Sequence, residues 1–189
     1  PQPGENPVIS RIRISNAATT AAAYWKLYQL TVQSESTGTA GVPAYYLIEI
    51  YPYATNICIS NCTVSSNLNT DGWGRDDWRN RCNNGIFTRG KLNANHTIEN
   101  NLIKNTAFGI AIASSNTVVR GNTVQNFTND GSRVLGSYIL FEKNRVMDLI
   151  KVMTTAENHD DMFQAFTYAP GGTGQDTLKN DTIRNNIFM

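Results

Sequence analysis

The chain has 189 residues and a formal net charge of +1, from 16 Lys and Arg against 15 Asp and Glu. This balance excludes a general nucleic-acid-binding protein and a polybasic membrane-surface protein. A hydrophobic content of 40% excludes long intrinsic disorder. No apolar run reaches the roughly 18 residues of a transmembrane helix, so we expect no membrane insertion. The 23 Asn and 20 Thr residues are poor helix formers and disfavour a helical bundle.

The N-terminal region predicts an arm, a loop and then a short strand. Residues 1–8 contain three prolines and lead into the domain, and residues 33–44 have the Ser, Gly and Thr content of a flexible loop. Residues 47–50 (LIEI) follow as a β-prone run. Short apolar runs and Asn-, Gly-, Ser- or Thr-rich turns alternate through the rest of the chain, which predicts short strands and leaves no room for helices.

A six-residue pattern repeats along the chain: apolar, two variable residues, Asn, one variable residue, apolar. It occurs at 98–103, 119–124, 141–146 and 183–188, and with Cys62 or Leu30 in place of Asn at 59–64 and 27–32. The shortest separations between the Asn positions are 21 and 22 residues, which defines a basic coil of about 22 residues. The longer separations are read as the same coil with inserted loops.

Each coil also contains a second β-prone run. These runs are 47–50, 85–88, 109–112, 131–135 and 162–166. A coil with two or three short strands cannot bury its apolar side chains alone, but coils stacked at about 4.8 Å pair every strand in parallel with its neighbours. The repeated Asn side chains then hydrogen-bond from coil to coil in a ladder that ends at Cys62 or Leu30. Asn also tolerates the left-handed backbone of a sharp bend.

The three cysteines do not predict a disulfide framework. Cys58 and Cys62 lie four residues apart in what we take as one strand, with Cα atoms about 13 Å apart, too far for a disulfide. For Cys82, two roles stay open: a buried apolar residue, or one partner of a cysteine pair. With only His96 and His159 as histidines, the sequence predicts no zinc site.

The repeats, above all those at 98–103, 119–124 and 183–188, resemble the right-handed parallel β-helix family with the pectin-lyase-like fold. The resemblance covers roughly residues 9–189. It implies an all-β, single-domain solenoid of about six to seven coils with inserted loops. It also implies that function lies on the outer face of one sheet and in the flanking loops. Because the fold hosts polysaccharide lyases, glycoside hydrolases, uronan epimerases, phage tailspikes and adhesins, it implies no single activity.

The first candidate site is the polar excursion at 65–84. Trp73 and Trp78 can stack on sugar rings. Charged side chains of the same segment can bond sugar hydroxyls or carboxylates; they are Arg75, Asp76, Asp77 and Arg79. The alternative is a loop whose Asp and Arg side chains pair with one another and whose Trp residues anchor it to the coil. A Ca²⁺ site made of acidic residues, with Arg89 or Arg120 as the catalytic base, stays open, although no diagnostic motif is present. The sequence requires no cofactor.

The second candidate site is residues 157–164 (ENHDDMFQ), which begin within a second predicted excursion at 147–161. Aligning the second strands places Asp161 beside Asp130 of the preceding coil. Two carboxylates about 5 Å apart can act as an acid paired with a base or nucleophile. Asp160 or Glu157 can take the same role, and His159 can act as a general base near neutral pH.

Further residues complete this second candidate. Lys151 and Arg133 can bind acidic sugar groups, and Gln164 is a candidate substrate contact. The stretch 157–160 resembles the Asp-Pro-His-Asp core of mannuronan epimerases, with Glu and Asn in its first two positions. The alternative is a hydrated turn in which Asp160 and Asp161 cap backbone N–H groups.

Three functions stay open from the sequence. The leading one is an extracellular or virion-associated carbohydrate-active β-helix, similar to a phage tailspike, that binds a long acidic polysaccharide and cleaves it as a lyase or hydrolase. The second is a non-catalytic structural or adhesion shaft, as a rule within a homotrimer, and the third is a secreted bacterial lyase or epimerase. Because the chain reaches Met189 directly after a repeat, we expect it to continue beyond this residue or another subunit to cover its last coil.

Overall fold

The computed structural model describes residues 7–15, 22–36, 45–90, 94–152, 160–167 and 178–189. Within these ranges the chain forms nineteen short β-strands and one helix, α1 (Arg75–Arg81). The strand pairings are parallel throughout the described ranges. The predicted all-β, parallel architecture is therefore confirmed.

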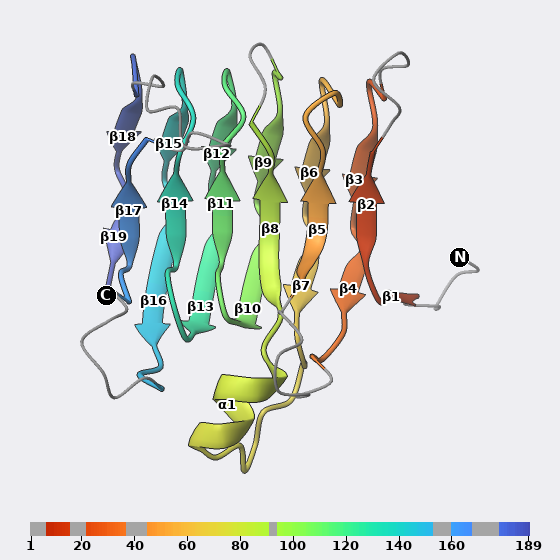
Figure 1. Ribbon diagram of the computed structural model, residues 1–189, viewed down its shortest axis with the longest axis vertical. Helices are drawn as coiled ribbons and strands as arrows, with labels where there is room; N and C mark the ends of the chain where they lie inside the picture. The colour runs from red at the N-terminus through yellow and green to blue at the C-terminus, as the bar shows by residue number, and fades with distance from the viewer. Residues whose placement is uncertain (1–6, 16–21, 37–44, 91–93, 153–159, 168–177) are drawn as a thin grey trace.

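The strands form three sheets, which we number by the first strand of each (Figure 1). Sheet I contains, in order, β1 (Val8–Ile9), β4 (Thr31–Gln33), β7 (Thr63–Ser65), β10 (Leu102–Thr106), β13 (Thr123–Phe127), β16 (Arg145–Leu149) and β19 (Ile187–Phe188). Sheet II contains β2 (Ile12–Ile14), β5 (Tyr46–Ile50), β8 (Asn84–Thr88), β11 (Ile110–Ile112), β14 (Ser132–Val134) and β17 (Phe163–Ala165). Sheet III contains β3 (Lys26–Tyr28), β6 (Cys58–Ser60), β9 (Thr97–Glu99), β12 (Val118–Arg120), β15 (Leu140–Glu142) and β18 (Thr182–Arg184).

The chain visits the sheets in the fixed order I, II, III and then returns to sheet I one strand further along. Neighbouring strands of each sheet therefore come from consecutive passes of the chain, as stacked coils require. Figure 1 shows these passes side by side, from β1 near the N-terminus to β17, β18 and β19 near the C-terminus. The arrangement is consistent with the predicted parallel β-helix, while its right-handed winding and its number of coils stay predictions.

Apolar side chains at matching positions of successive passes form the core between the sheets. In sheet I, one column of paired residues runs through five neighbouring strands and is fully buried: Val32, Val64, Ile103, Val124 and Val146. β-Branched side chains suit this position because they pack well against neighbours on a pleated surface. Each pass thus contributes one apolar layer, and stacking buries it on both sides.

The repeated six-residue pattern spans the corner between sheet III and sheet I. The residue before the Asn position has a positive φ, namely 54° at Gln29 and Asn61, 55° at Asn100, 63° at Gly121, and 56° at Lys143 and Asn185. This residue, and not the repeated Asn, therefore makes the left-handed bend. The prediction that Cys58 and Cys62 share one strand is wrong for the same reason: Cys58 begins β6, whereas Cys62 follows the bend at Asn61.

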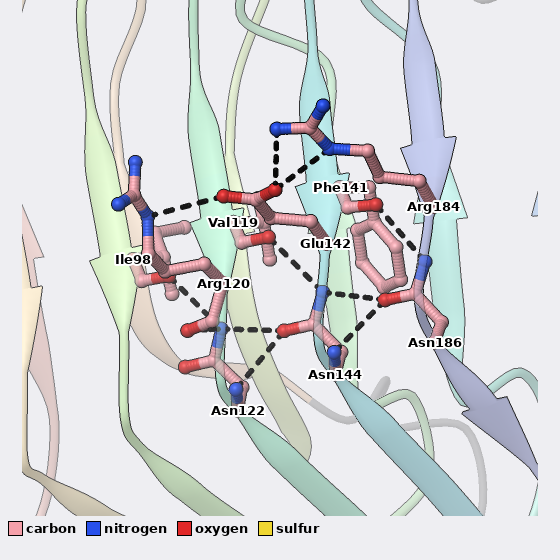
Figure 2. Close-up of polar contacts among 9 residues, drawn as sticks. All are labelled: Ile98, Val119, Arg120, Asn122, Phe141, Glu142, Asn144, Arg184 and Asn186. Carbon is pink, nitrogen blue, oxygen red and sulfur yellow. Dashed lines mark hydrogen bonds and ion pairs between the residues drawn. The ribbon is translucent and has the colours of Figure 1, made fainter.

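The predicted asparagine ladder is confirmed for Asn101, Asn122, Asn144 and Asn186 (Figure 2 shows the last three). Each Nδ2 donates to the Oδ1 of the next Asn, over 2.9 Å from Asn101, 3.0 Å from Asn122 and 3.1 Å from Asn144. At the other end, Asn101 Oδ1 accepts a 2.9 Å hydrogen bond from the backbone N–H of Cys62. The side-chain ladder ends there as predicted, because a thiol cannot replace the amide.

The excursion at 65–84 contains helix α1, which corrects the prediction that the chain has no helix. This segment lies outside the stacked strands, so the pairing that keeps the coils extended does not act on it. Asp77 Oδ2 accepts a 3.0 Å hydrogen bond from the N–H of Gly74 at the start of the helix, and Arg81 donates to Asp77 one turn later over 3.1 Å. A second predicted excursion, 147–161, begins inside strand β16 (Arg145–Leu149).

The cysteines are free thiols, so Cys82 does not form the pairing that the sequence left open. Burial raises the pKa of Cys82 to about 12 and also raises the pKa of Cys62. Both side chains therefore behave as small apolar groups. In the part of the chain that the structure describes, no helix has the length and apolar character needed to cross a membrane.

Candidate functional site

The predicted acidic site is only partly within the described residues. Glu157 and His159 lie outside them. Asp130 is buried, and Asp160 and Asp161 are partly buried at the start of the pass that contains β17. The N–H of Gly131 donates to the carbonyl of Asp161 over 2.9 Å, which places Asp161 beside Asp130 on the neighbouring pass.

Asp130 has both carboxylate oxygens engaged by its surroundings. Its Oδ1 accepts a 3.0 Å hydrogen bond from the backbone N–H of Asp161, and its Oδ2 is paired with Arg133 Nε. The Asp161 Oδ2 accepts a 2.6 Å hydrogen bond from Gln164 Nε2. Asp130 thus holds the next pass and orients Arg133, whereas Asp161 is the carboxylate of this pair that reaches the surface.

Arg133 lies among aromatic rings on the outer face of sheet II. Its guanidinium carbon is 4.1 Å from the ring centroid of Phe108 and 5.8 Å from that of Phe166, distances typical of cation–π contacts. Lys151, predicted to share this site, is an exposed residue that follows β16. The structure therefore brings together Asp130, Asp161, Gln164 and Arg133, whereas Lys151 follows a strand of sheet I and not of sheet II.

The tryptophans of the 65–84 excursion pack against each other. The rings of Trp73 and Trp78 meet edge to face with centroids 5.0 Å apart, and Arg81 stacks on Trp73 at 4.7 Å. The two rings therefore pack within the excursion itself, and Arg81 covers one face of Trp73. Arg75 Nε donates to the carbonyl of Val152 over 2.8 Å, and the side chains of Asp76 and Arg79 lie on the exposed surface of α1.

An ion pair also fixes the same excursion to the body of the protein. Arg81 lies 2.7 Å from Glu35, two residues after β4, and also pairs with Asp77. Figure 1 places α1 beyond the ends of the strands, away from the middle of sheet II. The contacts match the alternative reading of this segment as a self-paired loop anchored to the coils.

A second concentration of charge lies on sheet II around Glu49, and of its residues only Arg89 was given a role from the sequence, as a possible base. Strand register aligns one row across the outer face, in the order Arg13, Glu49, Phe87, Ala111, Arg133 and Gln164. Their strand neighbours Ile48, Ile86 and Ile110 belong to the main core, so this row faces the other way. The outward apolar members of the row pack in a separate cluster with Leu135 and Tyr46.

Three arginines converge on the Glu49 carboxylate. Glu49 is 2% exposed, and its Oε2 lies 3.0 Å from Arg11 Nη2 and 3.5 Å from Arg13 Nε. Its Oε1 accepts a 2.9 Å hydrogen bond from Arg89 Nε and is also paired with Arg89 Nη2. We call Glu49, Arg11, Arg13 and Arg89 the arginine centre.

Aromatic rings hold the guanidinium groups in place. Arg11 lies 4.5 Å from the ring centroid of Tyr45, and Arg13 and Arg89 lie 4.9 and 5.0 Å from that of Tyr51. Arg13 also donates from Nη2 to the Tyr51 hydroxyl. The arginine side chains are therefore oriented before any ligand arrives, which lowers the entropic cost of binding.

The arginine centre carries an excess of positive charge at the surface. Three guanidinium groups against one carboxylate leave a formal charge of +2, and the side chains of Arg11, Arg13 and Arg89 are 30%, 49% and 38% exposed. Burial opposes the charged form of Arg89, but its hydrogen bonds to Glu49 and the charge of Glu49 outweigh this and raise the pKa of Arg89. The centre stays cationic at any physiological pH and suits carboxylate, sulfate or phosphate groups.

One sequence signal points to this centre. Residues 11–14 (RIRI) place two charges at alternate positions, on one face of a β-prone run, and residues 46–50 (YLIEI) place one charge within a second β-prone run. The sequence does not reveal that Arg13, Glu49 and Arg89 fall on neighbouring passes of the chain, because inserts of different length separate them.

Neither a metal-ion site nor a comparison with known proteins assigns a function to these residues. Across the described ranges, no group of three or more His, Cys, Asp or Glu side chains is placed to hold a metal ion. No family model, curated protein or solved structure matches the chain.

Proposed function

We propose that this protein binds a long acidic polysaccharide along the outer face of sheet II. The observation that carries the proposal is the arginine centre, in which Arg11, Arg13 and Arg89 surround one buried carboxylate and retain a formal charge of +2. Arginine forks bind carboxylates and sulfates with two parallel hydrogen bonds, and adjacent aromatic rings pack on the apolar faces of sugars.

The direction of the bound chain follows from the row on sheet II. Successive members of the row lie on strands spaced by about 4.8 Å, so the row crosses the strands along the stacking direction. A glycan that follows the row meets the arginine centre near β2, β5 and β8 and then Arg133 and Gln164 near β14 and β17. This extended surface suits a polymer more than a single sugar.

A binding assay with a matched charge control tests the proposal. We expect the wild type to bind acidic polysaccharides of a panel and not to bind neutral dextran. We expect Arg13→Gln to weaken binding to the acidic polysaccharides by about tenfold. Arg120→Gln removes the same charge from sheet III and leaves binding unchanged. Isothermal titration at two salt concentrations measures both, since binding to exposed arginines weakens as salt rises. Failure of every acidic polysaccharide to bind, or equal loss in the two variants, contradicts the proposal.

Cleavage of the bound glycan is a second candidate function, favoured by the position of Asp161. Its carboxylate is partly exposed on the face that carries Arg133 and Gln164, and a carboxylate beside a bound sugar can act as acid, base or nucleophile. If the protein cleaves, Asp161→Asn abolishes the release of reducing ends while binding persists. Unchanged turnover in this variant contradicts the role of Asp161.

The sequence resemblance supplies the biological setting of the proposal. A pectin-lyase-like, right-handed β-helix that binds acidic glycans fits an extracellular or virion-associated protein, similar to a phage tailspike. A homotrimeric adhesion shaft is the alternative setting. Sedimentation analysis separates the two, since a monomer in solution argues against the trimeric shaft.

A further inference from the structure

We propose that the polysaccharide alternates acidic and neutral sugars and does not carry an acid on every sugar. This inference rests on the proposed function and concerns which acidic glycan the same surface accepts. The outer face of sheet II has opposite charge at its two ends, and a ligand that follows the row must match both.

The two ends of the row differ in the sign of their charge. At the arginine centre, Arg11, Arg13 and Arg89 against Glu49 give +2. At the other end, the carboxylates of Asp130 and Asp161 and the guanidinium of Arg133 sum to a formal charge of −1. Asp160, the residue before Asp161, adds a further carboxylate. The Asp130 side chain already neutralises Arg133, so this arginine is left with little attraction for a second anion.

A buried apolar cluster lies between the two charged ends. Between Glu49 on β5 and Arg133 on β14 the row contains Phe87 and Ala111, which are buried together with Ala113 and Leu135 and offer little surface of their own to a ligand. Three strand spacings separate β5 from β14, a distance of about 14 Å. This length exceeds one sugar, so a bound chain places different sugars at the two ends.

The charges then select the pattern of the glycan. A polymer with a carboxylate on every sugar has to place one of them beside Asp161, where repulsion between like charges opposes binding. A polymer that alternates acidic and neutral sugars places an acid at the arginine centre and a hydroxyl-rich sugar beside Asp161 and Gln164. Carboxylate and amide oxygens accept hydrogen bonds from those hydroxyls.

The experiment compares size-matched oligosaccharides of two kinds on the full chain by isothermal titration. Hyaluronan and unsulfated chondroitin oligosaccharides alternate uronate with a neutral sugar, and oligogalacturonate carries a carboxylate on every sugar. We expect the alternating oligosaccharides to bind the wild type about tenfold more tightly. We expect Asp161→Asn to tighten oligogalacturonate binding about fivefold and to reduce this preference, because it removes the repulsion.

A matched variant and a separate outcome keep the inference distinct from the proposed function. Asp148→Asn removes one exposed carboxylate from sheet I, and we expect it to leave the preference unchanged. Binding of oligogalacturonate at least as tight as that of both alternating glycans, with Arg13→Gln still weakening it, overturns the inference and leaves acidic-glycan binding standing. Binding of none of these oligosaccharides overturns both.

Discussion

Asparagine performs two separate tasks in this chain. Among the residues that the structure describes, nine Asn have positive φ: Asn56, Asn61, Asn95, Asn100, Asn105, Asn116, Asn126, Asn180 and Asn185. Four others form the ladder inside the corner between sheets III and I. The first task uses the tolerance of Asn for the left-handed backbone, and the second uses its paired donor and acceptor. The high asparagine content is therefore a consequence of winding short coils with tight bends.

The ladder makes an internal asparagine costlier to remove than the one at its C-terminal end. Asn122 is fully buried, and its Oδ1 accepts from both the backbone N–H and the side chain of Asn101. We expect Asn122→Ala to lower the free energy of unfolding by about 3 kcal/mol, because it leaves buried polar groups without partners. Asn186→Ala, at a partly exposed position, should cost about 1 kcal/mol. Urea denaturation measures both, and equal costs contradict the argument.

Lys143 occupies a left-handed position that suits glycine better. Its φ is 56°, and the equivalent position one pass earlier is Gly121. We expect Lys143→Gly to raise the free energy of unfolding by about 1 kcal/mol, since a side chain is strained in this conformation. Lys104→Gly, inside strand β10 and not at a positive φ, should lower it. Thermal unfolding compares the two, and destabilisation by both changes would show that the bend imposes no strain.

At the scale of the strand, the elements were predictable and one helix was not. The runs at 47–50, 85–88, 109–112, 131–135 and 162–166 overlap strands β5, β8, β11, β14 and β17. These strands follow from local apolar patterns that stacking enforces. Helix α1 was missed because its seven residues form outside the stack, where capping by Asp77 and contacts with Glu35 and Val152 decide the structure.

Sheet III carries a row of alternating charges that makes stability depend on pH. Glu142 lies between Arg184, 2.8 Å away, and Arg120, 3.8 Å away (Figure 2). The hydrogen bond from Arg184 and the nearby positive charges lower the pKa of Glu142 in the folded protein. The contribution of Glu142 to the free energy of unfolding is therefore complete above its ordinary pKa of 4.5, and it is lost as the pH falls through the lower pKa of the folded protein.

A charge-neutral variant checks this pH dependence. Glu142→Gln should be less stable than the wild type at pH 7, and the difference should shrink as the pH falls below 4.5. Arg184→Gln should lose the same pH-dependent part, because it removes the hydrogen bond that lowers the pKa. Urea midpoints at pH 7, 5 and 3 measure the effect. A difference between wild type and Glu142→Gln that stays constant over this range contradicts it.

At the scale of the molecule, the fold was more predictable than the site. The period of about 22 residues indicates stacking whatever the length of the inserts, because the insert leaves the register of the strands unchanged. The arginine centre depends on that register across two inserts, since 36 residues separate Arg13 from Glu49 and 40 separate Glu49 from Arg89. Alignment of the repeats paired Asp130 with Asp161, but it did not extend to Arg13, Glu49 and Arg89, so the arginine centre was missed.

Stacked passes contact only their neighbours, so stability should depend on position along the stack. Ile103 in β10 is fully buried between the passes on either side, whereas Ile183 in β18 is 44% exposed. We expect Ile103→Ala to lower the free energy of unfolding by about 3 kcal/mol and Ile183→Ala by less than about 1 kcal/mol. Urea denaturation monitored by circular dichroism measures both. Equal losses would mean that the apolar layers do not support one another as a stack.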